Sequence, residues 1–341
     1  MKKSILAGLC ALSLLLGLLC GCQPADVTEP SLNLRDESPA TTEATEPPTT
    51  EAPTEPPLPD PEFPLSATHV FVYDCGKEKL LFHKGGLDDQ IPMASITKLF
   101  TCFVALEYMS GDTVITVGDE VSMIDPDSST AYVRPGHQLT VDMMVQALML
   151  PSGNDAAYAL AVAAGRTIRG DSQISAQTAL SAFVGEMNAF ALELWPSSHF
   201  ANPDGIDAPG HYTTLDDLIT VCRQAMANET IRKYAAQATA DVTYASGQTN
   251  SWKNSNLMLH ESSAYYCEAA CGLKTGSTNG AGKCLVSAFE TEDGYLLIGV
   301  LGGQTDGARY EDTLRLYSYY TGVSVTLPGD QQPTESTAAA G

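Results

Sequence analysis

Apolar residues in the central part of the chain follow two periods, one typical of strands and one typical of helices. Residues 68–85 and 283–303 each predict a pair of strands, joined at 75–77 and at 293–294, because short apolar segments meet there at turn-forming residues. The apolar spacing elsewhere predicts helices over 94–109, 139–150, 154–165, 174–194, 213–226 and 310–322. Strands at both ends with helices between them predict an α/β (α+β) fold, an antiparallel sheet with an inserted helical lobe.

Capping and turn-forming residues predict where some of these elements begin and end. Gly165 is predicted to end the third helix. Thr214 and Asp217 have the spacing of a capping box at the start of the fifth. Residues 199–212 contain many turn formers and predict a long loop.

The first 22 residues have the pattern of an export signal. Two lysines precede an apolar stretch, 5–19, which is short for a membrane span. The sequence LCGC that ends at Cys22 resembles the bacterial lipobox, and this resemblance implies that Cys22 is lipidated and becomes the mature N-terminus. Such a lipoprotein is expected at the outer face of the cell membrane, anchored without a span. An ordinary secretory signal that happens to contain cysteines is the alternative.

Composition divides the rest of the chain into three parts. Residues 23–64 are rich in Pro, Thr and Glu and poor in large apolar residues, so a disordered, extended linker is expected. Residues 65–327 are long enough for one substantial core and form the expected catalytic domain. Residues 328–341 are polar again and predict a disordered tail.

Charge and cysteine content narrow the possible partners. The formal net charge of -23 argues against nucleic acid, because phosphate binding needs clustered Lys and Arg. No metal or other cofactor is expected. The sequence does not choose among the possible pairings of the cysteines outside the signal, and the apolar surroundings of most of them favour buried free thiols. These cysteines are Cys75, Cys102, Cys222, Cys267, Cys271 and Cys284. The segment CEAAC, 267–271, has no interpretation from the sequence.

Three short motifs carry the candidate chemistry. In chain order they are Ser95-x-x-Lys98, Ser152-Gly153-Asn154 and Lys274-Thr275-Gly276, a combination typical of active-site serine enzymes that recognise penicillin. Serine needs an adjacent base to become a nucleophile. Residues three apart on a helix share a face, so Lys98 can place its amine beside Ser95. Lysine is a base only when its pKa falls, which burial and a nearby cation promote, and Lys274 is the candidate cation.

Each motif also has a structural interpretation. Lys98 could be a solvated helix lysine, although its apolar neighbours argue against this. Asn154 could cap a helix that begins at Asp155. The segment 274–276 could be a strand end with a turn glycine. In the functional interpretation Ser152 relays a proton, Asn154 holds Lys98 and the substrate amide, and Lys274 and Thr275 hold an anionic group of the substrate.

The chain resembles the serine D-alanyl-D-alanine carboxypeptidases, the low-molecular-mass penicillin-binding proteins of peptidase family S11. The segments IPMASITKLFT, LMLPSGNDAAYALA, FVGEMNAFALEL, HFANPDGI, HYTT and GLKTGSTNGAGKCLVSA carry this resemblance, which covers nearly the whole body. It implies the β-lactamase/DD-peptidase fold and removal of the terminal D-Ala from peptidoglycan stem pentapeptides through an acyl-enzyme. β-Lactam antibiotics would be covalent inhibitors.

The resemblance also implies roles for individual residues. Ser95 would be the acylated nucleophile and Lys98 its general base. The backbone N–H groups of Ser95 and Ser277 would form the oxyanion hole. The implied catalytic residues are Ser95, Lys98, Ser152 and Asn154. The implied substrate-binding residues are Lys274, Thr275, Gly276, Ser277 and Arg309, the last near the substrate carboxylate.

Departures from the family pattern leave alternatives open. Ser277 replaces the Tyr, His or Thr common after Lys-Thr-Gly, and activity is expected to survive because the backbone acts there. Many members carry a C-terminal β-rich domain and an amphipathic anchor, and here the N-terminal lipid is expected to replace that anchor. A DD-endopeptidase of the same family, a class A-like β-lactamase and a catalytically inactive peptidoglycan-binding lipoprotein are the alternatives. The β-lactamase is disfavoured because no Glu-x-x-Leu-Asn segment lies between Asp155 and Lys274.

Overall fold

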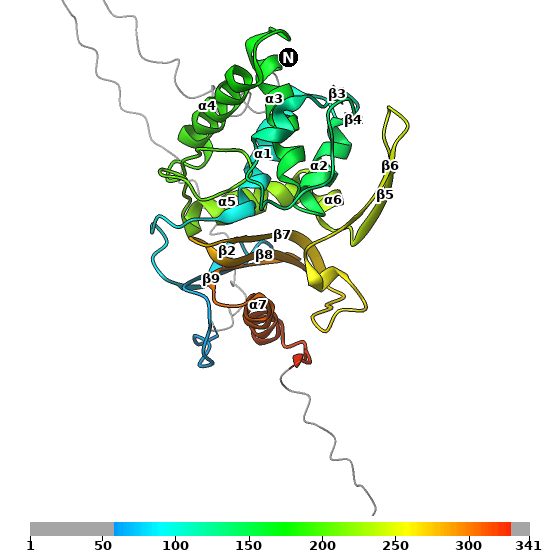
Figure 1. Cartoon of the computed structure of the whole chain (residues 1–341). Helices are drawn as coiled ribbons and strands as arrows, with labels where there is room; N and C mark the ends of the chain where they lie inside the picture. The colour runs from blue at the N-terminus through cyan, green and yellow to red at the C-terminus, as the bar shows by residue number, and fades with distance from the viewer. Residues whose placement is uncertain (1–57, 329–341) are drawn as a thin grey trace, which may run out of the picture. The chain divides into compact units, whose positions relative to one another are not determined.

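A five-stranded antiparallel sheet joins the two ends of the folded chain. The computed structural model describes residues 58–328, and its sheet has the order β2-β1-β9-β8-β7 with every neighbouring pair antiparallel (Figure 1). The strands are β1 (His69–Asp74), β2 (Lys79–Lys84), β7 (Ala270–Thr278), β8 (Gly282–Thr291) and β9 (Gly294–Gly303). Because β1 pairs with β9, the prediction of a sheet built from N- and C-terminal segments is confirmed.

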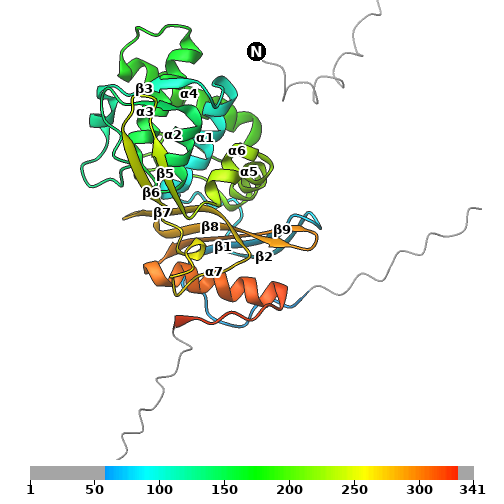
Figure 2. The ribbon, with the colours of Figure 1, turned by 90° about the vertical axis from the view of Figure 1, so that its right-hand side faces the viewer.

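The sheet separates two hydrophobic cores. α7 (Asp306–Thr321) lies along one face, and the helical lobe covers the other (Figure 2). On the α7 side, Phe289 stacks on Tyr317 with ring centroids 4.4 Å apart. Each large apolar side chain buried in this way contributes about 1.5–3 kcal/mol. α7 begins before the predicted residue 310 because Thr305 caps it, its hydroxyl accepting from the N–H of Ala308.

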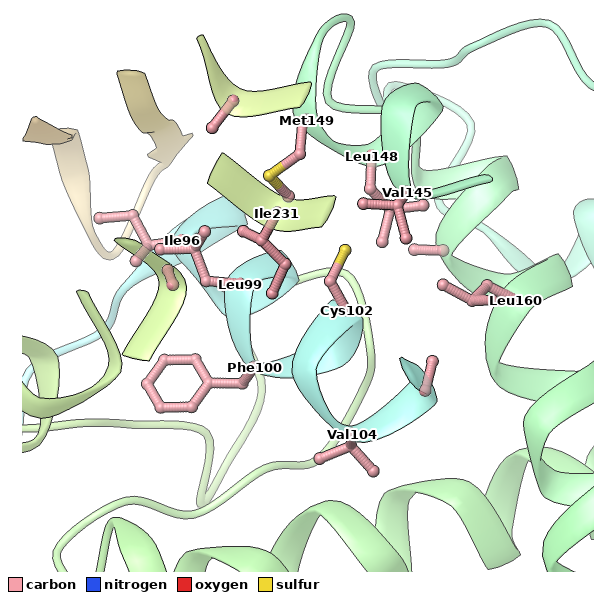
Figure 3. Packing of buried hydrophobic residues seen from close by; sticks show 14 of the residues in the cluster. Ile96, Leu99, Phe100, Cys102, Val104, Val145, Leu148, Met149, Leu160 and Ile231 are labelled. Carbon is pink, nitrogen blue, oxygen red and sulfur yellow. The ribbon is translucent and has the colours of Figure 1, made fainter. Parts of the chain in front are cut away.

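The helical lobe is organised around one nearly buried helix. Its helices are α1 (Thr97–Tyr108), α2 (Val141–Met149), α3 (Asn154–Arg169), α4 (Ala176–Leu194), α5 (Leu215–Ala227) and α6 (Glu229–Ala235). α1 contacts each of the other five, and eight of its twelve residues are buried (Figure 3). Phe100 packs edge-on against Trp195 with ring centroids 4.8 Å apart. A helix buried on most sides holds any polar group on it in a fixed, dry place.

Several short elements complete the lobe and its junction with the sheet. They are the antiparallel pair β3 (Val114–Thr116) and β4 (Gln138–Thr140), the hairpin β5 (Thr239–Thr243) and β6 (Thr249–Lys253), and the 3₁₀ turns η1 (Ala94–Ile96), η2 (Asp119–Met123) and η3 (Leu257–Leu259). β3, β4, β5, β6 and α6 were not predicted from the sequence, and residues 139–140 of β4 fell within the helix predicted over 139–150.

Some predicted helix ends are wrong. α3 continues past Gly165 to Gly170, whose φ of 64° ends it. A Cβ at position 165 would lie 1.9 Å from the carbonyl oxygen of Ala179, so that glycine allows α3 and α4 to pack closely. The capping box is only half present. Thr214 accepts from the N–H of Asp217, whose own carboxylate accepts from elsewhere.

The described region begins before the predicted boundary at residue 65. Phe63 packs edge-on against Tyr319, whose hydroxyl donates to the carbonyl of Pro59. The carbonyl of Cys267 accepts from the N–H of Ala270, the first residue of β7, so the CEAAC segment contains the turn into that strand. All six cysteines of residues 58–328 are free thiols. Within these residues no helix is long and apolar enough to cross a membrane. Cys22 lies outside the described residues.

Candidate active site

Ser95 lies in the 3₁₀ turn η1, directly before α1, and not inside the α-helix that the sequence predicted. The Lys98 Nζ nevertheless lies 2.8 Å from the Ser95 Oγ. Ala94 reaches a φ of 48°, which is uncommon for a residue with a side chain. The turn therefore presents the serine hydroxyl at the end of a buried helix, beside an amine from that helix's first turn.

Residues 200–211 pack against this turn and stabilise its conformation. Thr97 Oγ1 donates to the carbonyl of Ala94 and lies 2.9 Å from His211 Nε2. The Nδ1 of His211 accepts from the N–H of Ala201, so Nε2 carries the proton and donates to Thr97. Burial lowers the pKa of His211 to about 4, which keeps the ring in this neutral form. Gly205 fits here because a Cβ would lie 1.9 Å from the Ala94 carbonyl oxygen.

Lys98 is fully buried, and its amine has three oxygen neighbours. Besides Ser95, the Nζ lies 2.7 Å from Asn154 Oδ1 and 2.7 Å from the carbonyl oxygen of Asp204. Burial lowers the pKa of Lys98 to about 8. Burial therefore accounts for the lowered pKa of Lys98, and the charge of Lys274, which the sequence suggested as a second cause, does not contribute. The alternative of a solvated helix lysine is excluded, and the amine is placed to exchange a proton with the serine.

The loop between α2 and α3 orients the side chain of Asn154. Asn154 is the first residue of α3, whose N-cap is Gly153, so its proposed capping role is wrong. Its N–H donates to the carbonyl of Ser129, and the Ser129 hydroxyl donates to the carbonyl of Ser152. Ser152 has a φ of 62°. Within residues 58–328 the Ser152 hydroxyl makes no hydrogen bond, so its relay role stays a prediction.

The third motif lies in β7, whose end approaches the Ser95 turn. A Cβ on Gly276 would lie 3.1 Å from the Ser95 backbone nitrogen and 3.0 Å from the Ala94 Cβ, so glycine allows this approach. Lys274 is fully buried and donates to the carbonyl of Thr275 at 2.9 Å. Burial lowers the pKa of Lys274 well below its usual value, and the charges of Lys98 and Arg309 lower it further.

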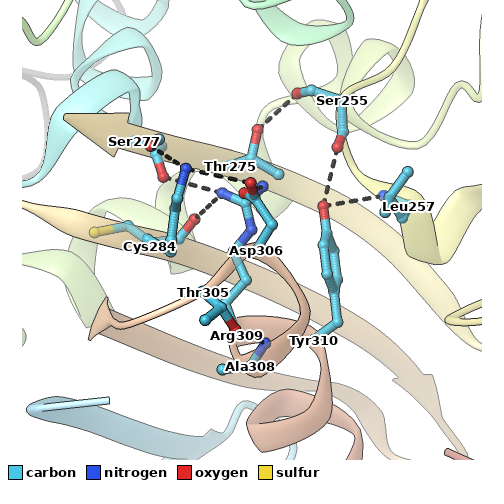
Figure 4. Close-up of polar contacts among 12 residues, drawn as sticks. Ser255, Leu257, Thr275, Ser277, Cys284, Thr305, Asp306, Ala308, Arg309 and Tyr310 are labelled. Carbon is cyan, nitrogen blue, oxygen red and sulfur yellow. Dashed lines mark hydrogen bonds and ion pairs between the residues drawn. The ribbon is translucent and has the colours of Figure 1, made fainter. Parts of the chain in front are cut away.

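Two hydroxyls tie β7 to the segment before η3. Thr275 Oγ1 lies 2.6 Å from Ser255 Oγ, and the Ser255 carbonyl accepts from the Tyr310 hydroxyl (Figure 4). That same hydroxyl accepts from the N–H of Leu257. Tyr310 thus connects α7 to the wall of the site. Ser255 was not singled out from the sequence, because a lone serine in a polar segment carries no signal of its partner.

The Arg309 side chain extends from α7 to β7 and β8, where it donates mainly to backbone carbonyls. Its Nη1 donates to the carbonyl oxygens of Gly276 at 3.0 Å and Cys284 at 3.2 Å, and its Nη2 pairs with Asp306 at 2.9 Å (Figure 4). Only 9% of its side chain is exposed. Arg309 therefore fixes the neighbouring ends of two strands.

The structure also shows where the predicted residues meet. The three motifs converge where η1, the α2–α3 loop and β7 come together, whereas Arg309 lies beside the end of β7. Four groups at the site were not predicted from the sequence, namely the Asp204 carbonyl and the side chains of Ser255, Thr97 and His211. The segment HFANPDGI drew attention to the loop but did not indicate its contact with Lys98. A shallow cavity of about 360 Å³ adjoins the end of β7, lined by Pro92, Asp207, Ala208, Pro209, His211 and Gly280.

Comparison with known proteins identifies the family to which the chain belongs. The family model for peptidase S11, D-alanyl-D-alanine carboxypeptidase, matches residues 53–305. The D-alanyl-D-alanine carboxypeptidase of Streptomyces sp. strain K15 is 32% identical over 266 residues, which are 75% of this chain and 87% of that protein. D-alanyl-D-alanine carboxypeptidase DacC of Escherichia coli K12 is 28% identical over 269 residues, which are 76% of this chain and 62% of that protein. The chain thus spans less than two thirds of the length of DacC.

Solved structures show the same fold. The crystal structure of the Streptomyces K15 DD-transpeptidase superposes with a TM-score of 0.67 at 28% identity, covering 76% of this chain and 98% of that one. A D-alanyl-D-alanine carboxypeptidase from Mycobacterium tuberculosis H37Rv gives a TM-score of 0.64 at 25% identity, with 78% and 94% covered. The fold prediction is confirmed. The chain belongs to the peptidase S11 family of D-alanyl-D-alanine carboxypeptidases.

Proposed function

We propose that the protein is a serine D-Ala-D-Ala carboxypeptidase that removes the terminal D-Ala from peptidoglycan stem pentapeptides. One observation carries the proposal: the buried Lys98 amine lies 2.8 Å from the Ser95 Oγ, with its pKa lowered to about 8. A lysine in this state is a usable base near neutral pH, which a solvated lysine is not. Membership in the family supports the substrate class.

In the proposed acylation step, neutral Lys98 accepts the Ser95 hydroxyl proton while Oγ attacks the carbonyl carbon of the penultimate D-Ala. The bond from Oγ to carbon forms, and the carbon–nitrogen bond then breaks. The leaving D-Ala amine takes up the proton, which Ser152 can pass on from Lys98. Asn154 keeps the amine directed at Ser95 through its 2.7 Å contact with Nζ. Water then releases the shortened peptide from Ser95.

The proposed oxyanion hole consists of the backbone N–H groups of Ser95 and Ser277. The close approach of Gly276 to the Ser95 backbone supports this role, because it brings the end of β7 beside the nucleophile. Thr275 and its partner Ser255 are the proposed hydroxyls beside the substrate terminus. Lys274 belongs to the same wall, and its buried amine donates to the carbonyl of Thr275.

Covalent labelling tests the nucleophile. Intact-mass measurement after penicillin treatment should show one long-lived adduct on the wild-type protein and none on Ser95→Ala. The matched control is Ser172→Ala, in the exposed turn after α3, about 24 Å from the site by the length of that helix. An adduct that persists on Ser95→Ala excludes Ser95 as the nucleophile, and rapid loss of the wild-type adduct indicates a β-lactamase.

Product analysis tests the reaction. With a pentapeptide muropeptide, the wild-type protein should release D-Ala and leave a tetrapeptide. Cleavage of cross-linked dimers with no D-Ala release would replace this proposal by the endopeptidase alternative. No product from either substrate, together with no penicillin adduct, would indicate the catalytically inactive lipoprotein.

We also propose that Cys22 carries the lipid that anchors the protein to the outer face of the cell membrane, with residues 23–57 as the tether. The signal-like residues that precede Cys22 and the Pro-rich composition that follows it support this. A palmitate analogue fed to expressing cells should label the wild-type protein and not Cys22→Ala. Equal labelling of both proteins would refute lipidation at Cys22.

A further inference from the structure

Four cationic side chains lie near the proposed site, and they differ in what they can offer a ligand. Lys98 and Lys274 are fully buried, and the Arg309 side chain is 9% exposed. The Lys283 side chain is 30% exposed. A substrate approaches from solvent, so Lys283 is the cation of this group that it meets most directly.

Lys283 is held at the mouth of the site by the residue that follows Lys-Thr-Gly. Ser277 in β7 and Lys283 in β8 are cross-strand partners, and the Lys283 Nζ donates to the Ser277 Oγ at 2.9 Å. Thr275 lies two residues before Ser277, so both hydroxyls are on one face of β7. The short side chain of Ser277 leaves room for the lysine to reach this face.

Arg309 is less available to a substrate than the family resemblance implies. Both donors of its Nη1 are used by the carbonyls of Gly276 and Cys284, and its Nη2 pairs with Asp306. Its Nε has no hydrogen-bond partner among the described residues but is buried away from solvent. Lys274 donates to a backbone carbonyl and has a strongly lowered pKa. Asp306 also pairs with Lys283 at 3.2 Å. Two cations thus share one carboxylate, which leaves this cluster with a net positive charge beside Ser277.

We propose that Lys283 is a specificity-determining residue that receives the C-terminal carboxylate of the acyl-D-Ala-D-Ala substrate, while Arg309 is a positioning residue that holds β7 and β8. The inference rests on the proposed carboxypeptidase function. The carboxylate follows the scissile carbonyl by one residue, so a carbonyl held at the Ser277 N–H places it near the hydroxyls of Thr275 and Ser277. The Lys283 amine is within hydrogen-bond distance of that second hydroxyl.

The test compares full-chain Lys283→Met with wild type on a D-Ala-D-Ala peptide and on the same peptide with an amidated C-terminus. We expect kcat/KM for the carboxylate substrate to fall about tenfold, mainly through KM, and kcat/KM for the amide to change little. Added salt should weaken the wild-type preference for the carboxylate and have little effect on that of the variant. Lys79→Met, on β2 at the opposite edge of the sheet, makes the same charge change and should behave as wild type.

A second variant keeps the proposal testable if Lys283→Met disturbs the fold. Asp306→Asn removes the competing carboxylate and should raise kcat/KM for the carboxylate substrate about 2- to 5-fold, the size of an exposed charge interaction. An unchanged carboxylate preference in both variants would overturn the role of Lys283. Equal losses on the two substrates would show a structural role and also overturn it. If wild type turns over neither substrate, the proposed function fails first.

Discussion

The two sides of the site achieve their geometry in different ways. On the helical side, a single amine, Lys98, has three oxygen neighbours supplied by three separate segments of the chain. On the sheet side, Lys274 has one acceptor, the carbonyl of its own neighbour in β7. The helical side fixes one proton-accepting group closely, whereas the sheet side presents a row of backbone and hydroxyl groups along a strand.

Backbone conformation shows the same difference. Ala94 and Ser152 both have positive φ values, 48° and 62°, and both lie on the helical side of the site. Such conformations cost about 1–3 kcal/mol each and persist only where the surroundings impose them. β7 reaches the site at Gly276 in regular pairing with β8. Two of the four described non-glycine residues with a positive φ therefore lie where the chemistry is proposed, the other two being Glu78 and Tyr132. The sheet side of the site is built at Gly276 from regular strand structure.

Among substitutions on the two sides of the site, replacing Lys98 is expected to have the largest effect on the rate of acylation. Lys98→Arg keeps the positive charge but cannot accept a proton, because guanidinium stays protonated near neutral pH. The rate of acylation by penicillin should fall at least about 100-fold, the scale of general base catalysis. The measurement is the pseudo-first-order rate of adduct formation. A near wild-type rate would mean that the close contacts around Lys98 serve only structure.

The pH dependence tests the same amine without mutation. Since burial lowers the pKa of Lys98 to about 8, acylation should rise about tenfold per pH unit up to that pH and then level off. The rate near pH 6 should thus be about 100-fold below the plateau. A flat profile from pH 6 to 10 would exclude Lys98 as the titrating base.

The same pKa predicts the sign of a stability effect. Lys98 binds its proton more weakly in the folded protein, with a pKa of about 8 against 10.5 for a free lysine. Unfolding therefore takes up a proton between these pH values, and the free energy of unfolding should increase with pH there. Lys98→Met lacks this contribution. The free energy of unfolding of wild type minus that of Lys98→Met should therefore increase as pH rises from 8 to 10.5.

The sequence predicted the regular parts of the molecule and the identity of the motifs because both depend on local patterns. The hairpin at 293–294 and the nearly continuous apolar surface of α1 are visible in the residues themselves. The hairpin of β5 and β6 was missed because its exposed strands are mostly polar. Alternation of Val242 and Tyr244 with polar residues, followed by a Ser-Gly turn, is the signal that could have revealed it.

The details of the site depend on contacts between distant segments, which local patterns do not encode. The Asp204 carbonyl is a backbone group, so no residue type marks it as a partner of Lys98. Ser255 acquires its role only because the segment before η3 lies beside β7. Gly165 was misread because a glycine that ends a helix and one that allows two helices to pack look the same in sequence.

Two substitutions at Asn154 should have an intermediate effect. Together they distinguish the positioning of the Lys98 amine from the control of its protonation state. Asn154→Ala removes the 2.7 Å contact with Lys98, and acylation should fall about 10- to 150-fold at every pH, the value of a hydrogen bond to a charged group. Asn154→Asp keeps the acceptor but adds a negative charge, which raises the pKa of Lys98. Its activity should fall at pH 7 and recover at higher pH. Identical profiles for the two variants would contradict the role of Asn154 in setting the state of the amine.

The smallest effect is expected on the sheet side, at Ser255. Ser255→Ala leaves the Thr275 hydroxyl without its 2.6 Å partner, and the loss of one neutral hydrogen bond should lower kcat/KM about 2- to 12-fold. Because this side of the site is proposed to bind rather than to transfer protons, the change should appear mainly in KM, and the pH profile set by Lys98 should not shift. Thr275→Val removes the other half of the contact. Expressed as free energies from kcat/KM, the loss in the double variant should therefore be smaller than the sum of the two single losses. Additive losses would show that the two hydroxyls act separately, and a shifted pH profile would mean that the sheet side also controls the amine, which would erase the difference between the two sides.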